Sequence, residues 1–152
     1  MQMRPNKFTI RVYGILQRGH EVLVAEEIHK GRRMNKFPGG GLEPGEGTAA
    51  CVVREFLEET GLTVEVRQHF YTTDFFVASA FDPQVQVISI YYLVSSTQPF
   101  EPPRQLLEAH AQEDEIFRWI DPLAIDPVAY FTFPIDQHVG KLLQTWMEAQ
   151  KA

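Results

Sequence analysis

Glycine and proline crowd the segment from Gly31 to Gly47, which contains the run Pro38-Gly39-Gly40-Gly41 and the pair Pro44-Gly45. This composition favours a loop over a long helix or strand. Long ordered loops in compact domains are more often functional than idle. The next residues, Thr48 to Thr60, have the pattern of a helix, because Thr48 can cap its start and Gly61 can end it in the left-handed conformation. The sequence therefore predicts a functional loop joined directly to a helix.

The size and charge of the chain narrow the class of protein. With 152 residues, of which 44% are hydrophobic and 22% charged, it is typical of one globular domain, so we expect a single domain over residues 1–152. A net charge of −6 disfavours nucleic acid as the main partner, because a nucleic-acid site needs a dense basic face. An acidic protein can still bind phosphates when a divalent cation lies between them.

The cysteine content and the hydropathy of the chain exclude further classes of protein. The one cysteine, Cys51, rules out an intramolecular disulfide and a four-cysteine zinc site, and we interpret it as a packing residue. The start of the chain, Met1 to Lys7, leads into no long apolar run, so we expect no signal peptide. No later stretch is apolar enough to span a bilayer, which indicates a cytoplasmic protein without a membrane partner.

Periodicity predicts the remaining elements. Phe8–Leu16 and Glu21–Glu27 are expected to pair as a hairpin, and Leu62–Tyr71, Val85–Val94 and Glu115–Ile120 to form further strands, with Val85–Val94 central in the sheet. Asp136–Lys151 has the apolar stripe of a closing helix. Strands and helices in this order predict an α/β fold, with a mixed sheet covered by helices on both faces.

Three carboxylates share one face of the helix predicted over Thr48–Thr60. With Glu55 at zero on a helical wheel, Glu59 falls at about 40° and Glu58 at about −60°. The opposite face is expected to be buried, and it carries Ala49, Val53, Phe56 and Leu57. Three like charges near a helix C-terminus repel one another and the helix dipole. They form either a solvated acidic face or a site for a hard cation such as magnesium, manganese or calcium.

The same segment resembles the Nudix box, whose pattern is G-x5-E-x7-R-E-U-x-E-E-x-G-U with U an apolar residue. All specified positions are filled, by Gly40, Glu46, Arg54, Glu55, Phe56, Glu58, Glu59, Gly61 and Leu62. Only Phe56 departs mildly, being aromatic where an aliphatic residue is usual. Phe37-Pro38-Gly39-Gly40 and the strand ending in Arg118-Trp119-Ile120 are also similar to the family. The resemblance implies an α/β/α sandwich with a mixed central β-sheet over nearly the whole chain.

Members of the Nudix family hydrolyse a nucleoside diphosphate linked to another group, with the help of a divalent metal. The resemblance implies that Glu55, Glu58 and Glu59 hold Mg²⁺ or Mn²⁺, with the Gly40 carbonyl as a further ligand. Glu58 and Glu59 are also implied in catalysis, and Arg54 would orient the glutamates through salt bridges. We interpret Glu46 as support for the start of the helix, with a direct metal role as the alternative.

The family usually adds one carboxylate from outside the box. Glu113 is our first candidate, as a catalytic residue, and Glu115 the second, as a metal ligand; the alternative is a solvated run of charge. Arg32 and Arg33, in a basic group with Lys30 and Lys36, are candidates for binding substrate phosphates. Phe75 and Phe76 could stack on a base, although aromatic side chains also serve in packing.

The resemblance implies a small nucleotide as substrate and, in many members, a homodimer. ADP-ribose or a nucleotide sugar is slightly favoured over modified nucleoside triphosphates. The main alternative is a non-catalytic nucleotide-sensing module. Such modules usually lose glutamates of the box, and here the box is intact.

Overall fold

The computed structural model describes residues 4–151. Met1–Met3, the first residues of the segment in which we expect no signal peptide, and Ala152 lie outside the described residues. The chain divides into two compact units, which are described separately. Unit 1 comprises the chain up to Ile15 together with Gly39–Gln98, and unit 2 comprises Leu16–Pro38 and the chain from Pro99 onward. The single domain predicted over residues 1–152 stays a prediction.

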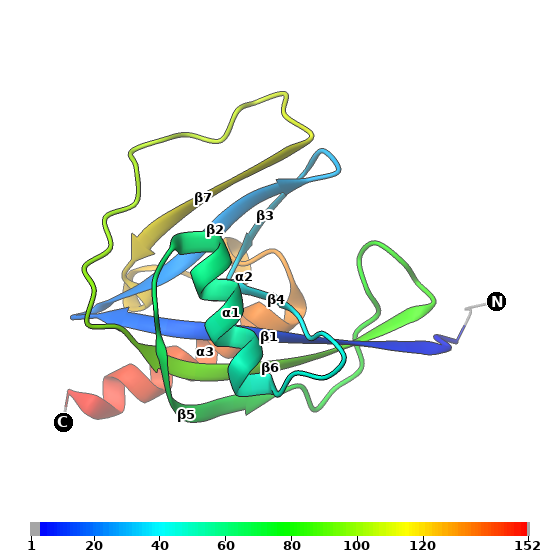
Figure 1. Ribbon diagram of the computed structural model, residues 1–152, viewed down its shortest axis with the longest axis horizontal. Coiled ribbons are helices and arrows are strands. Elements are labelled where there is room, and N and C mark those ends of the chain that lie inside the picture. The colour runs from blue at the N-terminus through cyan, green and yellow to red at the C-terminus, as the bar shows by residue number, and fades with distance from the viewer. Residues whose placement is uncertain (1–3, 152) are drawn as a thin grey trace. The chain divides into compact units, whose positions relative to one another are not determined.

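Unit 1 is built around the strand β1 (Lys7–Arg18), whose last three residues belong to unit 2 (Figure 1). On one side β1 pairs with the short antiparallel strand β4 (Gly39–Gly41), and on the other it neighbours β6 (Val85–Ser95). β6 in turn pairs antiparallel with β5 (Glu65–Thr72). The strand predicted over Val85–Val94 therefore lies inside the sheet, as the sequence indicated.

Helix α1 (Thr48–Thr60) packs on this sheet, and its predicted bounds are confirmed. The N-cap is Gly47, not Thr48, whose hydroxyl instead hydrogen-bonds the Tyr92 hydroxyl at 2.6 Å. Gly61 ends the helix with φ of 77°, the left-handed conformation that the sequence predicted.

The sheet of unit 2 is centred on β2 (Glu21–His29), which follows β1 through a tight hairpin with Arg18 opposite Glu21. β2 pairs antiparallel with β3 (Arg32–Lys36) and with β7 (Glu113–Ile120). The hairpin between β1 and β2 and the strand before Asp121 are thus confirmed, the latter starting two residues earlier than predicted.

Three helical segments close unit 2: η1 (Pro122–Ala124), α2 (Pro127–Tyr130) and α3 (Pro134–Gln150). Val139, Leu143 and Met147 form the buried stripe of α3, as predicted. Gly140 is also buried in α3. A Cβ atom added there would lie about 3 Å from Pro127 and from the Phe131 ring, so the close packing of the helix requires a glycine at this position. Among the described residues, no helix is long and apolar enough to cross a membrane.

The segment Gly31–Gly47 is not the continuous loop that its composition predicts. It contains both β3 and β4, and only the residues after Gly41 form an irregular connection to α1. The prediction is wrong here because these short strands are specified by their partners: β3 pairs with β2 from His29↔Arg32 to Ala25↔Lys36, and β4 pairs with β1. Such tertiary pairing leaves no periodic signal in the sequence.

Candidate functional site

Helix α1 turns two of its carboxylates toward the protein interior. The buried residues of α1 are Cys51, Val52 and Phe56, whereas Leu57 is 54% exposed. The predicted buried face, with Ala49, Val53, Phe56 and Leu57, is therefore wrong by about a quarter turn, and only Phe56 belongs to it. Glu55 and Glu59 consequently lie on the same side of the helix as the buried residues, and the Glu55 side chain is only 13% exposed. A merely solvated acidic face does not place a carboxylate there.

The main chain of β4 lies directly against the Glu55 carboxylate. A Cβ atom added to Gly40 would come within 2.6 Å of Glu55 Oε1. The neighbouring Gly39 has φ of +151°, and a side chain there would overlap the Val12 carbonyl oxygen at 2.1 Å. Both glycines are thus required by close approach, and they bring the peptide backbone to the carboxylate of α1.

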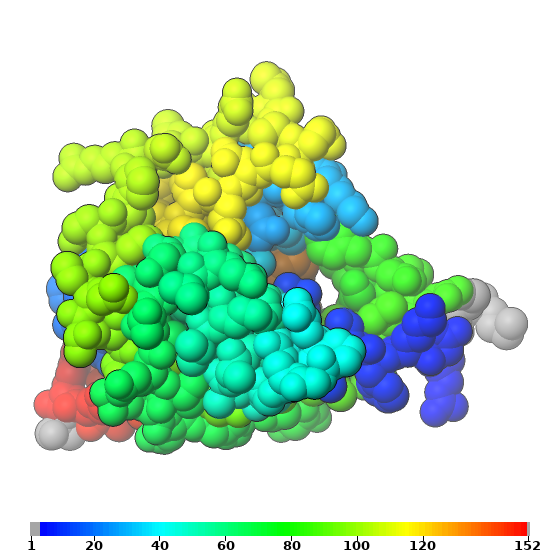
Figure 2. All heavy atoms as spheres, viewed as in Figure 1, coloured from blue at the N-terminus to red at the C-terminus, as the bar shows by residue number. Residues whose placement is uncertain are grey.

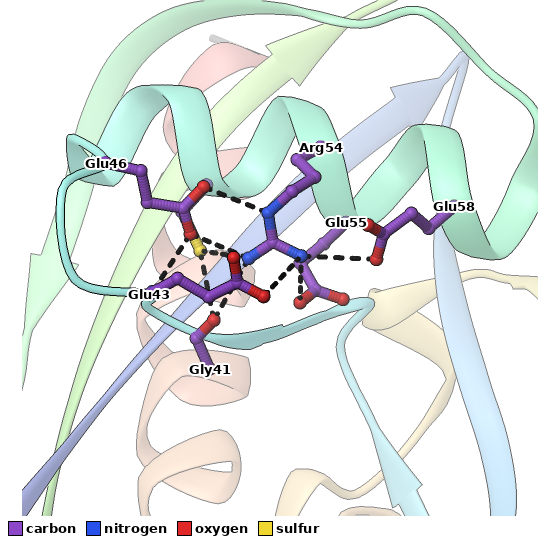
Figure 3. Close-up of polar contacts among 7 residues, drawn as sticks. Gly41, Glu43, Glu46, Arg54, Glu55 and Glu58 are labelled. Atoms are coloured by element: carbon purple, nitrogen blue, oxygen red, sulfur yellow. Dashed lines mark hydrogen bonds and ion pairs between the residues drawn. The ribbon is translucent and has the colours of Figure 1, made fainter.

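Arg54 is the centre of the polar contacts in unit 1 (Figure 3). Its Nε and Nη2 donate to the two carboxylate oxygens of Glu46 at 2.9 and 2.7 Å, a bidentate arrangement. Nη1 donates to Glu55 at 3.0 Å and to Glu58 at 3.2 Å, and Nη2 also donates to the Gly41 carbonyl oxygen at 3.2 Å. One guanidinium therefore links the loop before α1, two carboxylates of the helix and the end of β4.

The pKa shifts around Arg54 follow from these contacts. Hydrogen bonds from Arg54 and from the Glu43 amide lower the pKa of Glu46 to about 2. The bond to Glu46 in turn raises the pKa of Arg54 above its ordinary value. Burial raises the pKa of the Cys51 thiol to about 12, so this thiol stays protonated at neutral pH, consistent with a packing role.

The carboxylates of the box differ in exposure. The Glu58 side chain is 59% exposed, whereas Glu59 is half-buried and its Oε2 atom is fully buried. Over residues 4–151, no three histidine, cysteine or acidic side chains are gathered closely enough to hold a metal ion as they stand. Glu46, Glu55 and Glu58 instead each contact the Arg54 guanidinium that lies between them.

Glu113 and Glu115, the two candidates for an extra carboxylate, belong to unit 2. The Glu113 carboxylate is 2.9 Å from His29 Nδ1 and accepts a hydrogen bond from the Lys30 amide at 3.2 Å. The contact with His29 is the main cause of the lowered pKa of Glu113. Its carboxylate therefore fastens the start of β7 to the hairpin between β2 and β3.

Glu115 has a different environment. It lies directly opposite Glu27 on β2, and Glu27 Oε2 is 2.7 Å from Lys36 Nζ. Lys36, which the sequence analysis grouped with Lys30, Arg32 and Arg33, is only 7% exposed. Sequence reasoning missed Glu27 and Lys36 as partners, because only the register of β2 and β3 brings them together. Two carboxylates in opposite positions of neighbouring strands repel each other, and the buried ammonium offsets this repulsion.

The predicted substrate-binding residues fall into both units. In unit 2, the Arg32 guanidinium lies 5.7 Å from the centroid of the Phe133 ring, and Arg33 is exposed opposite Ile28. In unit 1, Phe75 and Phe76 are 38% and 60% exposed in the loop after β5. The roles of these four residues in substrate binding stay predictions.

Known proteins resemble this chain in sequence and in fold. The model of the NUDIX domain family matches residues 5–139. The mouse (Mus musculus) protein nucleoside diphosphate-linked moiety X motif 6 is 51% identical over 47 residues, which are 31% of this chain and 15% of that protein. The match thus spans only a small part of that relative's length.

Solved structures extend the similarity over nearly the whole chain. A NUDIX hydrolase from Nitrosomonas europaea matches with a TM-score of 0.68 and 22% identity, over 91% of this chain and 90% of that one. The ORF135 protein of E. coli gives 0.65 and 20%, over 96% and 95%, and a MutT protein from Methanosarcina mazei Go1 gives 0.66 and 18%, over 90% and 92%. These likenesses confirm the predicted α/β fold with its mixed sheet.

Proposed function

This chain belongs to the NUDIX family of hydrolases, which act on pyrophosphate bonds, and we propose that it cleaves a nucleoside diphosphate linked to another group in a Mg²⁺-dependent reaction. The observation that carries this proposal is the set of oxygen atoms around Arg54. It combines an inward-facing Glu55 carboxylate, the glycine backbone packed against it, and an arginine that links Glu55 and Glu58 to the loop before the helix.

The donor chemistry of this set fits a hard divalent cation. All candidate ligands are oxygen atoms, the type that Mg²⁺ and Mn²⁺ prefer. Gly40 has no side chain, so its backbone can approach a ligand shared with Glu55. We propose Gly40, Glu55, Glu58 and Glu59 as the residues that hold the ion, with a further carboxylate from β7. When bound, the ion supplies charge neutralisation for the diphosphate and activation of water.

The chain's own side chains have separate tasks in this proposal. Arg54 is a positioning residue, because it fixes Glu55 and Glu58 while Glu46 holds its guanidinium from the other side. Glu58 and Glu59 supply carboxylate oxygens that bind the cation or accept the proton of the attacking water. Removal of that proton turns water into the stronger nucleophile hydroxide. The reaction needs a strong nucleophile because the negatively charged diphosphate repels its attack.

We propose Glu115 as the extra carboxylate, in preference to Glu113, which the sequence put first. The Glu113 carboxylate is already bound by His29 and by the Lys30 amide, so catalysis would have to break these contacts. Glu115 lies farther along β7, opposite Glu27, which forms an ion pair with Lys36. The positive charge of Lys36 can hold the Glu115 carboxylate in a defined position as well.

For the substrate, we propose ADP-ribose or a nucleotide sugar ahead of modified nucleoside triphosphates. Arg32 and Arg33 are the candidates for its phosphates, and Phe75 and Phe76 for stacking on its base. We also propose a second copy of the chain as a partner. The main alternative remains a nucleotide-sensing module that binds without turnover.

One experiment separates the enzyme from the sensor. The purified protein is incubated with Mg²⁺ and a panel of ADP-ribose, nucleotide sugars and nucleoside triphosphates, and the released phosphate species are measured. The wild type is expected to hydrolyse at least one compound, and Glu59→Gln, which keeps the size of the side chain, is expected to lose that activity. Tight binding of one compound without turnover by the wild type would favour the sensor.

A further inference from the structure

Arg11 is the one charged residue in a long uncharged part of β1. From Phe8 to Leu16 every other residue is uncharged, and the next two residues after Arg11, Val12 and Tyr13, are 0% and 7% exposed. Arg11 itself is half-buried. A guanidinium at the border of the core loses part of its hydration, so it needs defined hydrogen-bond acceptors in return. The position therefore calls for a polar partner, from the protein or from a ligand.

Tyr13 holds the Arg11 side chain in place. The Arg11 Nε donates to the Tyr13 hydroxyl at 2.7 Å, and the Tyr13 ring stacks on the buried Tyr91 ring with 5.2 Å between the centroids. An arginine has five N–H donors, of which only one is on Nε. The bond to Tyr13 therefore fixes the direction of the two terminal nitrogens without using them.

The terminal nitrogens of Arg11 lie against β4. Arg11 is opposite Gly41 in the pairing of β1 with β4, and a Cβ atom added to Gly41 would lie 3.8 Å from Arg11 Nη1, an ordinary van der Waals contact. Within residues 4–151, β4 pairs with β1 alone, so its other side is an edge of the sheet. The guanidinium thus reaches the short edge strand that also contacts the carboxylates of α1.

Glu55 approaches β4 at the neighbouring residue. A Cβ atom added to Gly40 would lie 2.6 Å from Glu55 Oε1, and the side chains of consecutive strand residues point to opposite faces. Glu55 and Arg11 therefore lie on the two faces of β4, one residue apart. At the edge of the strand, the Gly41 carbonyl oxygen accepts from Arg54 at 3.2 Å (Figure 3). The end of β4 is thus flanked by one carboxylate and two guanidinium groups.

The end of β4 lies at the surface of unit 1. Gly41 and Leu42 are half-buried, and Glu43 is exposed. The Leu42 amide donates to the Ile10 carbonyl oxygen at 2.9 Å, and in Figure 2 the N-terminal strand (blue) and the segment after β4 (cyan) lie side by side at the surface. The end of β4 is therefore a place where a ligand can bind from solution.

We propose that Arg11 binds the diphosphate of the substrate at the end of β4. This inference rests on the proposed function, because it takes the ligand to be a nucleoside diphosphate linked to another group. One phosphate lies at the cation held by Glu55, Glu58 and Glu59, and further oxygen atoms of the diphosphate accept from the terminal nitrogens of Arg11. The guanidinium suits this task because its planar fork matches two phosphate oxygens.

The other lysine and arginine residues of unit 1 are not placed for this task. Arg54 donates to the carboxylates on either side of it, so its charge already offsets theirs. Arg4 and Lys7 precede the residues of β1 that pair with β4, and Arg67 is on β5, at the far edge of the sheet. The carboxylates of the box and a diphosphate together bring more negative charge than one divalent ion neutralises, so Arg11 supplies the further positive charge.

Calorimetric titration in the presence of Mg²⁺ tests the contact without requiring turnover. ADP and inorganic pyrophosphate are the two probes, because both contain a diphosphate and only ADP contains a nucleoside. Arg11→Gln removes the charge-assisted hydrogen bonds, so we expect its dissociation constants for both probes to rise by about 10–100-fold. Arg67→Gln, which removes an exposed arginine paired with Glu65 from the same unit, is the matched control and is expected to bind as wild type.

A double-mutant cycle with Tyr13 separates a binding role of Arg11 from a structural one. Tyr13→Phe keeps the ring that stacks on Tyr91 but no longer holds Arg11 Nε, so we expect the affinity for pyrophosphate to fall several-fold. In the Arg11→Gln background, the same substitution is expected to have no further effect. An effect of Tyr13→Phe that is equal in both backgrounds would contradict the placement of Arg11 by Tyr13.

The titration distinguishes failure of this inference from failure of the proposed function. A wild type that binds neither probe, an Arg11→Gln variant that binds both as tightly as the wild type, or a loss of affinity confined to ADP overturns the inference. Binding that depends on Arg11, without hydrolysis of any compound of the substrate panel, overturns only the proposed enzymatic function.

Arg11→Lys keeps the test decisive if thermal melting shows that Arg11→Gln does not fold. Lysine keeps the positive charge but lacks the planar fork, so we expect the dissociation constant for pyrophosphate to rise less than in Arg11→Gln but measurably above wild type. An Arg11→Lys variant with the affinity of the wild type in place of an unfolded Arg11→Gln would overturn the inference.

Discussion

Arg54 and Glu46 are joined by two hydrogen bonds, of 2.9 and 2.7 Å, between the guanidinium and both carboxylate oxygens. This pair spans from the loop before α1 to the middle of the helix. Because the same guanidinium also contacts Glu55 and Glu58, the orientation of the proposed metal ligands depends on it.

Removing Arg54 should impair hydrolysis less than removing a ligand. Arg54→Ala leaves every carboxylate in place but no longer orients it, so we expect kcat/KM to fall by about 10–100-fold. Glu59→Gln removes a proposed ligand and should cost more than that. Steady-state kinetics on the best substrate of the panel measures both losses. Equal losses, with intact folding by circular dichroism, would contradict the positioning role.

The pair of Arg54 and Glu46 should also make stability depend on pH. The pKa of Glu46 is lowered from 4.5 to about 2 in the folded state, chiefly by Arg54, so this carboxylate stabilises the fold above its unfolded pKa and the contribution is lost as the pH falls toward 2. Glu46→Gln lacks this contribution at every pH.

The difference in melting temperature between wild type and Glu46→Gln is therefore expected to be constant above about pH 5 and to close as the pH falls from 4.5 to 2. Glu113, whose pKa is also lowered, is present in both proteins and cancels in the comparison. A difference that persists unchanged to pH 2 would show that Glu46 does not act through its charge.

A side chain at Gly40 should displace Glu55. The added Cβ of Gly40→Ala would lie 2.6 Å from the Glu55 carboxylate, so we expect turnover to fall by roughly 10²-fold, as for other small misplacements of a catalytic group. Gly41→Ala is the matched control in the same strand, because its Cβ meets nothing closer than Arg11 Nη1 at 3.8 Å. Similar activity of the two variants would show that the contact of Gly40 with Glu55 has no part in the site.

Comparing Glu115→Gln with Glu113→Gln decides between the two carboxylates of β7. We expect Glu115→Gln to lose activity by about 10²-fold or more, and Glu113→Gln to stay within a few-fold of wild type, since Glu113 holds His29 and the Lys30 amide. Both substitutions remove one negative charge from the same strand, so a general effect of charge cancels. The reverse ranking would restore Glu113 as the catalytic residue.

Local signals in the sequence were sufficient for much of the fold. Gly61 ends α1 in the left-handed conformation, and Arg18 and Glu21 close the first hairpin, because each depends on a few neighbouring residues. The resemblance also implied that Arg54 orients the glutamates; Arg54 contacts Glu55 and Glu58, and its orienting role stays a prediction.

Other features depend on packing that no local pattern encodes. Apolar residues occupy a wide arc of α1, so the helical wheel did not determine which of them faces the core. In the structure Val52 is buried and Leu57 is 54% exposed. The burial of Lys36 follows from the register of β2 and β3. This register puts Lys36 opposite the small residue Ala25 and within reach of Glu27. Charged residues in a glycine-rich segment are usually exposed, and here tertiary pairing overrides that tendency.

The most direct test of the account is the effect of Mg²⁺ on thermal stability, because it needs no substrate. An ion that binds only the folded state stabilises it by about 2.7 kcal/mol at a hundredfold excess over its dissociation constant, and for a chain of this size this raises the melting temperature by several degrees. We expect this shift in the wild type and its near loss in Glu59→Gln. Without Mg²⁺, the variant should be no less stable than the wild type, since one of three repelling charges is gone. A strongly destabilised metal-free variant, or a wild type whose melting temperature Mg²⁺ does not change, would contradict the assignment of these glutamates as metal ligands.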